Sequence, residues 1–469
     1  MTSFIPAQRH LDLGDQFFDP VRPADFPETI LRHRDGRWAD RLGLGTLSDE
    51  EWLRHFGRFE PLAGSLPHPL ALRYHGHQFR SYNPDLGDGR GFLYAQCIDP
   101  EDGRLLDFGT KGSGKTPWSR GGDGRLTLKG GVREILATEM LEALGVYTSK
   151  SFSLVETAEE LYRGDEPSPT RSSVLTRLSH SHIRIGTFQR LAYLDDTKSL
   201  GKLVDYSIAN YYPELADAAD RPAALLEAVA AKVARLGAQW IAAGFVHGVL
   251  NTDNINITGE SFDYGPWRFV PTYDPNFTAA YFDETGLYSF GRQPDTLAWN
   301  LTRLAECLVP LSSVEALEPA LNTVWPVFRA ELPRQILRRL GLQPTDVERD
   351  GAFITALFGF LLESQAPYEQ FFFDWRGGLH SAERAARSPS AEHYMGETFR
   401  PIADLLESYA LAADCNLEHP YFARQTPRTM LIEDVEAIWA PIAERDDWSL
   451  FQTTLSEIAQ MRDAYGIKP

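Results

Sequence analysis

The stretch that most constrains the fold of this chain is His247-Gly-Val-Leu-Asn-Thr-Asp-Asn254, followed nine residues later by Asp263-Tyr-Gly. It comes directly after a helical pattern over 223–245, whose large apolar residues fall on one face. A long amphipathic helix, a polar loop and a second acidic turn in this order favour a buried helix that leads into a functional loop. The alternative is that the two short motifs are an ordinary Asn- and Asp-rich turn after a helix and a second, unrelated turn. The upstream residues therefore decide between the two interpretations.

The spacing of the polar residues matches part of a known catalytic pattern. A protein kinase catalytic loop reads His-Arg-Asp-x-x-x-x-Asn and is followed by Asp-Phe-Gly, because the Asn and the second Asp hold the magnesium ions that bridge nucleotide phosphates. Counted from His247, the kinase Asn falls on Asn254, but the catalytic Asp falls on Val249, which cannot accept a proton. An acidic group reappears at Asp253. The pattern keeps the metal ligands and loses the usual base.

Composition narrows the class of protein. The chain has 469 residues, 43% hydrophobic and 24% charged, which predicts a large core divided into two or three domains or lobes. A formal charge of −19 argues against a nucleic-acid partner, since such binding needs a basic footprint. The three cysteines form no Cys-x-x-Cys pair, which predicts a reducing compartment and no zinc site. No apolar run reaches a membrane-spanning length, so we expect a cytoplasmic protein without a membrane partner.

A glycine-rich turn leads into a predicted strand. The turn, Asn83-Pro-Asp-Leu-Gly-Asp-Gly-Arg-Gly91, precedes an alternating run over 92–98. Glycine lets backbone N–H groups approach phosphates because it adds no side chain, although such a turn is also typical of a plain hairpin. His75 and His77, just upstream, lack a third ligand at a recognisable spacing, and we expect structural hydrogen bonds there in place of a metal site.

The residues after the next predicted strand carry the most misleading motif of the chain. Gly109-Thr-Lys-Gly-Ser-Gly-Lys-Thr116 matches the P-loop pattern Gly-x-x-x-x-Gly-Lys-Ser/Thr at every fixed position. A P-loop must open a helix whose N-terminus receives the phosphates, but Pro117 and several glycines follow at once. The helix is predicted to begin near Gly130 and to stop at Gly145.

Lys111 and Glu134 fit a kinase-like arrangement better. Lys111 ends a predicted strand and Glu134 lies early in the predicted helix, which is the order of the kinase ion pair that places a lysine on nucleotide phosphates. The alternative is that each is a solvated surface charge. Asp123-Gly124-Arg125 forms a polar turn between the two elements.

Two arginines occupy the segment in which a kinase hinge would receive the adenine ring. Arg177 ends a short predicted strand over 174–177, and Arg184 follows it closely. An arginine fork suits phosphate oxygens better than a purine face. We infer that the polyphosphate tail points into this part of the cleft. The alternative is that both arginines pair with surface carboxylates.

Eight ordered motifs across residues 74–266 resemble the selenoprotein O family, also called the YdiU family. They are Tyr74-x-Gly-His-Gln-Phe79, Asn83-Pro-x-Leu-Gly-Asp-Gly-Arg90, Lys111-Gly-x-Gly-x-Thr-Pro-x-Ser-Arg120, Gly122-Asp-Gly-Arg125, Arg133-Glu134, Ser181-His-Ile-Arg184, His247 to Asn254 and Asp263-Tyr-Gly-Pro266. Similarity is weaker toward both ends of the chain.

The resemblance implies an α+β, protein-kinase-like fold with two lobes, an N-terminal arm and a helical C-terminal extension. The corresponding ranges are 1–65 for the arm, 66–190 for the nucleotide-binding N-lobe, 191–385 for the helical C-lobe with the catalytic loop, and 386–469 for the extension. It also implies a protein adenylyltransferase that binds ATP in a flipped orientation with Mg²⁺ or Mn²⁺ and transfers AMP to protein hydroxyls of Ser, Thr or Tyr.

The resemblance assigns a role to each candidate site residue. Asp253 is the proton acceptor, Glu134 supports Lys111 through an ion pair, and Asn254 and Asp263 hold the metal. The nucleotide contacts are Gly87, Gly89, Arg90, Lys111, Asp123, Gly124, Arg177, Arg184 and Asp263. A kinase that uses Asp253 as an unorthodox base and an inactive nucleotide-binding pseudokinase scaffold remain as alternatives.

The chain departs from the family at two places. Members often carry glycine where this chain has Arg80, beside the phosphate loop, and the effect of that cation is open. A selenocysteine or cysteine near the C-terminus, typical of some members, is absent, which puts redox regulation there in doubt. Whether Cys307 and Cys415 pair in space is also open.

Overall fold

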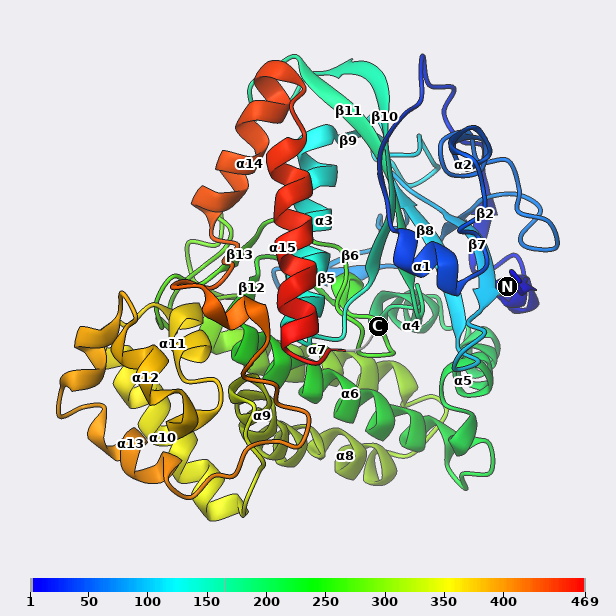
Figure 1. Ribbon diagram of the computed structural model, residues 1–469. Coiled ribbons are helices and arrows are strands. Elements are labelled where there is room, and N and C mark those ends of the chain that lie inside the picture. Colours follow the sequence, from blue (N-terminus) through cyan, green and yellow to red (C-terminus); the bar gives the residue numbers. More distant parts are fainter. Residues whose placement is uncertain (1–2, 165, 468–469) are drawn as a thin grey trace.

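One antiparallel sheet forms the upper right part of the molecule in the computed structural model, which describes residues 3–164 and 166–467 (Figure 1). Its main path runs β2-β4-β7-β8-β11-β10-β3, with β1 beside β7 and β9 beside β11. The strands are β1 (Pro6–Ala7), β2 (Phe18–Pro20), β3 (Ile30–Arg34), β4 (Leu70–Leu72), β7 (Leu93–Ile98), β8 (Leu105–Lys111), β9 (Leu126–Thr127), β10 (Lys150–Leu161) and β11 (Thr170–Ser179). The register places Lys111 of β8 opposite Leu175 of β11, so the lysine lies in the middle of the sheet.

The N-terminal arm that we expected over 1–65, packed on the main body, contributes three strands to this sheet. Strands β1, β2 and β3 pair with β7, β4 and β10. Helices α1 (Gly36–Arg41) and α2 (Asp49–Phe56) cover one face of the sheet, where Trp52 stacks on Phe152 with the ring centroids 5.0 Å apart. The three strands are too short to show a recognisable alternation, which is why the sequence patterns did not reveal them.

Helix α3 (Leu128–Ala143) packs against the sheet and is buried along most of its length. Thr127 caps its N-terminus by accepting a hydrogen bond from the Gly130 N–H at 3.1 Å. Helices α14 (Ile432–Arg445) and α15 (Ser449–Ala464) pack on α3, and Figure 1 shows α15 running alongside it. The C-terminal segment therefore returns to the sheet-containing lobe, and Arg462 of α15 forms ion pairs with Glu139 and Glu142 of α3.

The lower part of the molecule is helical and is organised around α6 (Arg221–Ala243) (Figure 1). This helix ends at Gly244, whose φ of 67° is a left-handed conformation that glycine adopts without strain. The other helices of this lobe are α4 (Ile185–Tyr193), α5 (Thr197–Tyr211), α7 (Gln293–Leu308), α8 (Val314–Asn322), α9 (Val324–Leu340), α10 (Val347–Ser364), α11 (Tyr368–Asp374), α12 (Ala382–Ala386) and α13 (Arg400–Leu406). No helix in the described ranges is both long enough and apolar enough to cross a membrane.

Two short hairpins lie outside the main sheet. Strands β12 (Phe245–His247) and β13 (Trp267–Phe269) pair with each other and bracket the loop that contains Asp253 and Asp263. Strands β5 (Gly76–Gln78) and β6 (Ser81–Asn83) form the second hairpin. A sheet with a packed α3, a helical lobe around α6 and a catalytic-loop segment between them form the kinase-like, two-lobed α+β fold that the sequence predicts. Cys97, Cys307 and Cys415 are all free thiols, so the pair considered above is not bridged.

Candidate active site

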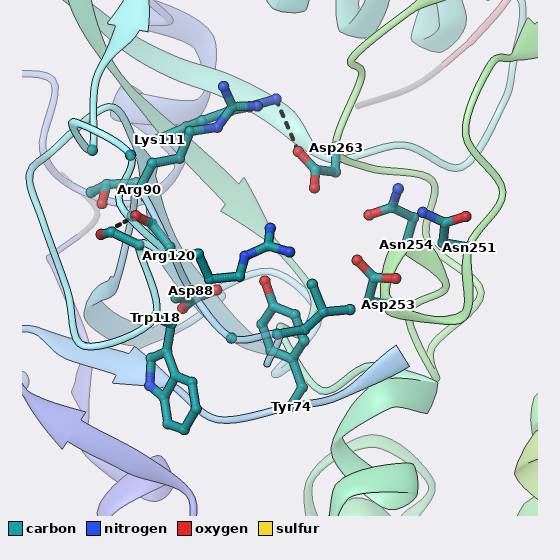
Figure 2. Close-up of a pocket in the computed structure, with 18 of the residues that line it drawn as sticks. Tyr74, Asp88, Arg90, Lys111, Trp118, Arg120, Asn251, Asp253, Asn254 and Asp263 are labelled. Carbon is teal, nitrogen blue, oxygen red and sulfur yellow. Dashed lines mark hydrogen bonds and ion pairs between the residues drawn. The ribbon is translucent and has the colours of Figure 1, made fainter. Parts of the chain in front are cut away.

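All the predicted nucleotide, metal and proton-acceptor residues line one cavity of about 610 Å³. The glycine-rich loop 86–91 and the polar turn 118–125 supply one wall, and the loop between β12 and β13 supplies the opposite wall (Figure 2). The cavity-lining residues predicted from the sequence are Gly87, Gly89, Arg90, Lys111, Asp123, Gly124, Arg177, Arg184, Asp253, Asn254 and Asp263. The remaining predicted residue, Glu134, lies behind Lys111 on α3.

Lys111 and Glu134 form the predicted ion pair. Glu134 is fully buried, and its Oε1 accepts a short hydrogen bond from the Lys111 ammonium group. Its Oε2 accepts a second bond from the backbone N–H of Tyr264 at 3.3 Å. The Lys111 Nζ also lies 2.9 Å from Asp263 Oδ1. Helix α3 thus holds the lysine at the cavity, and neither member of the pair is a solvated surface charge.

The P-loop match has no P-loop structure. Lys115 is exposed, and the residues after it form turns in place of a helix. The Oγ1 of Thr116 donates a 2.5 Å hydrogen bond to the Asp88 carbonyl, which ties this turn to the glycine-rich loop. The motif therefore serves as one wall of the cavity, and Lys111, not Lys115, is the buried lysine.

Arg177 and Arg184 are buried and pair with carboxylates of the cavity, not of the surface. Arg177 Nη1 lies 3.2 Å from Asp263 Oδ1. Arg184 donates from Nη2 to Asp88 Oδ1 at 3.3 Å and from Nη1 to the Asp253 carbonyl at 3.1 Å. The Nε atoms of both arginines have no hydrogen-bond partner in the described part of the chain. Buried N–H donors of this kind can bind anionic oxygen atoms.

Asp253 is a buried carboxyl group with a raised pKa and an unpartnered oxygen atom. Burial raises the pKa of its carboxyl to about 6, and the negative charge of Asp263 adds to that rise while Arg184 opposes it. Its Oδ1 is buried and has no hydrogen-bond partner among the described residues. Gly76 of β5 lies against it, because a Cβ at position 76 would come within 2.7 Å of Oδ1. Hairpin β5–β6 therefore closes one side of this carboxylate and leaves an acceptor atom available.

Asn254 and Asp263 fit a divalent metal ion. The Nδ2 of Asn254 donates to the Val249 carbonyl at 3.0 Å, so the Oδ1 of Asn254 remains an available ligand atom. Burial alone would raise the pKa of Asp263, but Lys111, Arg177 and Arg184 hold it well below its usual range. Ionised carboxylate and amide oxygens are ligands that Mg²⁺ accepts when substrate phosphates supply others. In residues 3–164 and 166–467, no three His, Cys, Asp or Glu side chains cluster to hold a metal by themselves.

The glycine-rich wall depends on a tryptophan that the motifs did not single out. A Cβ at Gly87 would come within 2.4 Å of the Trp118 ring, so the loop can approach the turn 118–125 only without a side chain there. Trp118 is fixed in turn by a 2.9 Å hydrogen bond from its Nε1 to Asp19. The Arg90 side chain extends from this loop and has no ion-pair partner among the described residues.

A hydrogen-bonded layer behind the catalytic loop was also missed by the sequence patterns. The Thr252 Oγ1 accepts from the His77 N–H at 2.7 Å and donates to Gln189 Oε1 at 2.6 Å. Gln189 Nε2 lies 2.7 Å from His77 Nδ1, so this histidine makes the structural hydrogen bond that we expected. His75 does likewise, with its Nδ1 2.8 Å from the Tyr82 hydroxyl. These contacts fix the residue next to Asp253.

Comparison with known proteins places the chain in one family. A family model described as "Protein adenylyltransferase SelO" matches residues 3–459. A protein nucleotidyltransferase YdiU of Synechocystis sp. is 46% identical over 95% of this chain and 96% of that protein. A second, from Gloeobacter violaceus, is 45% identical over 97% of this chain and 94% of that protein.

A solved structure, ROP2 from Toxoplasma gondii, has a protein-kinase fold and no enzymatic activity. It aligns with 64% of this chain and 85% of that chain at 13% identity, with a TM-score of 0.27. A similarity that low carries no weight, and the fold assignment rests on the sheet, α3 and the helical lobe. The family assignment rests on the match over nearly the whole chain, and by that match this protein belongs to the SelO family of protein adenylyltransferases.

Proposed function

We propose that this protein transfers AMP from ATP to hydroxyl groups of serine, threonine or tyrosine side chains in other proteins and releases pyrophosphate. The observation that carries the proposal is the gathering of Lys111, Arg177 and Arg184 at buried positions of the cavity. Ammonium and guanidinium donors match phosphate oxygens, whereas an adenine ring needs an apolar slot. ATP would therefore bind in a flipped orientation, with its β and γ phosphates on these cations.

The remaining cavity residues would contact the AMP half of the nucleotide. Gly87 and Gly89 give a close backbone approach, Arg90 offers an unpaired guanidinium, and Asp123 with Gly124 forms the turn opposite them. In this proposed orientation, the α-phosphorus would lie between the cations and the outer loops. The reacting centre would then lie within reach of Asp253.

The proposed reaction is attack of the acceptor hydroxyl oxygen on the α-phosphorus. A bond forms between that oxygen and phosphorus, and the bond from phosphorus to the oxygen bridging to the β-phosphate breaks, so that its electron pair leaves with pyrophosphate. Asp253 accepts the hydroxyl proton, since a carboxyl with a pKa of about 6 is ionised at neutral pH and its Oδ1 has no other partner. Lys111, Arg177 and Arg184 stabilise the charge of the leaving pyrophosphate.

Asn254 and Asp263 would hold the divalent ion, Mg²⁺ or Mn²⁺. Such an ion, when bound, neutralises charge on the phosphate oxygens. The protein keeps Asp263 ionised through its three cationic neighbours and orients Asn254 through the Val249 carbonyl. Val249 lines the cavity at the position of the kinase base and offers no proton acceptor.

The test uses ATP labelled at either the α or the γ phosphate. Incubated with divalent metal and lysate proteins, the enzyme should incorporate the α label into protein and leave the γ label in pyrophosphate. Incorporation of the γ label would instead establish a kinase that uses Asp253 as its base. Binding of ATP without incorporation of either label would establish a pseudokinase scaffold.

A further inference from the structure

A second groove, of about 510 Å³, opens beside the nucleotide cavity. Its walls come from α3, β13, α14 and the segment 279–282, and Figure 1 shows α14 beside α3. The groove is continuous with the nucleotide cavity, because Arg90, Lys111, Arg125 and Arg163 line both. A molecule bound in it would therefore lie next to the nucleotide.

The groove is basic although the chain as a whole is strongly acidic. Seven arginine and lysine side chains line it, against only two described carboxylates, those of Glu166 and Glu436. Lys129 forms an ion pair with Glu436, with Nζ 2.8 Å from Oε2. Lys111, Arg125 and Arg163 pair with carboxylates as well. Arg90, Arg133 and Arg268 have no ion-pair partner in the described part of the chain. In a chain with a formal net charge of −19, several arginines without a carboxylate partner along one groove indicate a binding surface.

Arg133 and Arg268 also repel each other. The Arg133 guanidinium lies over the Trp267 ring, 4.9 Å from its centre, and donates a 3.3 Å hydrogen bond to the Trp267 carbonyl. Burial lowers the pKa of Arg133 to about 10, and the positive charge of Arg268 contributes to the same fall. An anionic partner that contacts both guanidinium groups would offset this repulsion.

The outer wall of the groove carries exposed aromatic rings. Tyr281 is 87% exposed and Phe282 is 46% exposed, and their ring centroids lie 5.3 Å apart. The Phe282 ring also meets Phe79 of the β5–β6 turn at 5.9 Å. Aromatic and arginine side chains together are enriched where proteins bind polypeptides. A free anion would gain nothing from these rings, whereas a polypeptide can pack on them.

We propose that this groove binds an acidic polypeptide segment of the acceptor protein, adjacent to the hydroxyl that is modified. The aspartate or glutamate side chains of that segment pair with Arg133 and Arg268, and its backbone and apolar side chains pack on Tyr281 and Phe282. The role in transfer rests on the function proposed above, but the binding does not. The groove would select acceptors by charge before the hydroxyl reaches the cavity.

The test measures binding and transfer separately, with the full chain. The probe is a fluorescein-labelled peptide of alternating glutamate and serine residues, and a glutamine–serine peptide of the same length serves as its neutral control. Fluorescence anisotropy should show that the acidic peptide binds more tightly than the neutral one, and that the difference shrinks as salt is added. Arg268→Ala should weaken binding of the acidic peptide by roughly tenfold or more, since hydrogen bonds to charged groups contribute about 1.5–3 kcal/mol.

The variants are chosen so that each outcome is decisive. Arg268→Glu reverses the charge at the same position and should abolish binding, and Arg329→Ala, an exposed arginine on α9 outside the groove, should leave binding unchanged. Thermal melts check that all three variants fold. Equal affinities for the acidic and neutral peptides, or unchanged binding by Arg268→Glu, would overturn the proposal. Weakened ATP binding in Arg268→Ala with unchanged peptide binding would assign the groove to the nucleotide and also overturn it.

Peptide binding that depends on Arg268 in a protein that transfers no label would support the groove and reject only the proposed reaction. Conversely, α-label transfer to protein by Arg268→Glu at the wild-type rate, for acidic and neutral acceptors alike, would leave the reaction standing and refute the groove. Failure of the proposed groove can therefore be distinguished from failure of the proposed reaction.

Discussion

Lys111 gives the sharpest test of the site, because its removal should affect stability and nucleotide use in ways that can be separated. The Lys111→Met variant keeps the aliphatic stem and deletes the ammonium group. That group contacts Glu134, which is fully buried, and lies 2.9 Å from Asp263. Breaking a buried ion pair by removing one partner costs about 3–5 kcal/mol, since the other charge is left buried without compensation. We expect a loss of this size in the free energy of unfolding.

The double variant Lys111→Met/Glu134→Gln separates the two effects. Glutamine at 134 removes the orphaned charge and can still accept the hydrogen bond from the Tyr264 N–H. Most of the lost stability should return, because replacing both members of a buried pair is far less costly than breaking it. Nucleotide use should not return, since the cation that faces the phosphates is still missing.

The assay is chemical denaturation for stability and α-label incorporation for activity. Lys115→Met is the matched control, because Lys115 is exposed and a surface substitution there should change stability by no more than about 0.5 kcal/mol. It should also retain activity. An active Lys111→Met/Glu134→Gln variant, or an inactive Lys115→Met variant beside an active Lys111 variant, would refute the assignment and restore the P-loop interpretation.

Three further predictions concern single carboxylates and one strained residue. Asp253→Asn should bind ATP and metal nearly as the wild type does, yet transfer AMP roughly 10²–10⁴-fold more slowly, whereas Asp263→Asn should lose metal-dependent ATP binding; equal binding losses by calorimetry would contradict the two roles. Burial raises the pKa of Glu260 to about 7, so the folded state binds its proton more tightly than the unfolded chain, and stability should fall as pH rises from about 4.5 through 7. Glu260→Gln should remove that fall and stabilise the protein by ~1–3 kcal/mol at pH 8 with little change at pH 4. If the variant and the wild type melt identically at both pH values, this role of Glu260 is excluded. Arg80→Gly should leave stability within about 1 kcal/mol of the wild type, because φ at position 80 is 64° and glycine adopts that conformation without strain. The Arg80 guanidinium lies over the Trp299 ring, 5.5 Å from its centre, and a larger loss in thermal melts would mean that this contact outweighs the backbone effect.

Local patterns in the sequence were sufficient to predict the position of the helices that support the site. The apolar spacing over 223–245 predicts α6 to within two residues at each end, and the expected stop at Gly145 falls two residues beyond the end of α3. The apolar pattern over 314–340 predicts one continuous amphipathic helix, but the structure has two helices there, α8 and α9, which meet at Thr323. Periodicity cannot distinguish one long helix from two short ones when the apolar stripe continues across the break.

Other features depend on partners that are far apart in the chain. The His77 N–H and Thr252 Oγ1, which hold the catalytic loop, are separated by 175 positions. Asp263 adopts a left-handed conformation, with φ of 63°, that no local residue type announces. The packing of Trp118 on Gly87 likewise becomes visible only in three dimensions. Sequence motifs identify the groups that contact one cavity, but the residues that position those groups are set by tertiary packing.

The charge balance of the cavity explains how so many cations can be buried before a nucleotide binds. Arg184 pairs with Asp88, and Arg177 and Lys111 both pair with Asp263. Without these carboxylates, each buried cation would cost several kcal/mol of desolvation free energy. Burial raises the pKa of Asp88 although Arg184 opposes the rise, so Asp88 ionises less readily than Asp263. In the proposed function, an incoming phosphate would replace one carboxylate partner of each cation. The gain in binding would come from phosphate oxygens that contact several cations at once, which a single carboxylate cannot do.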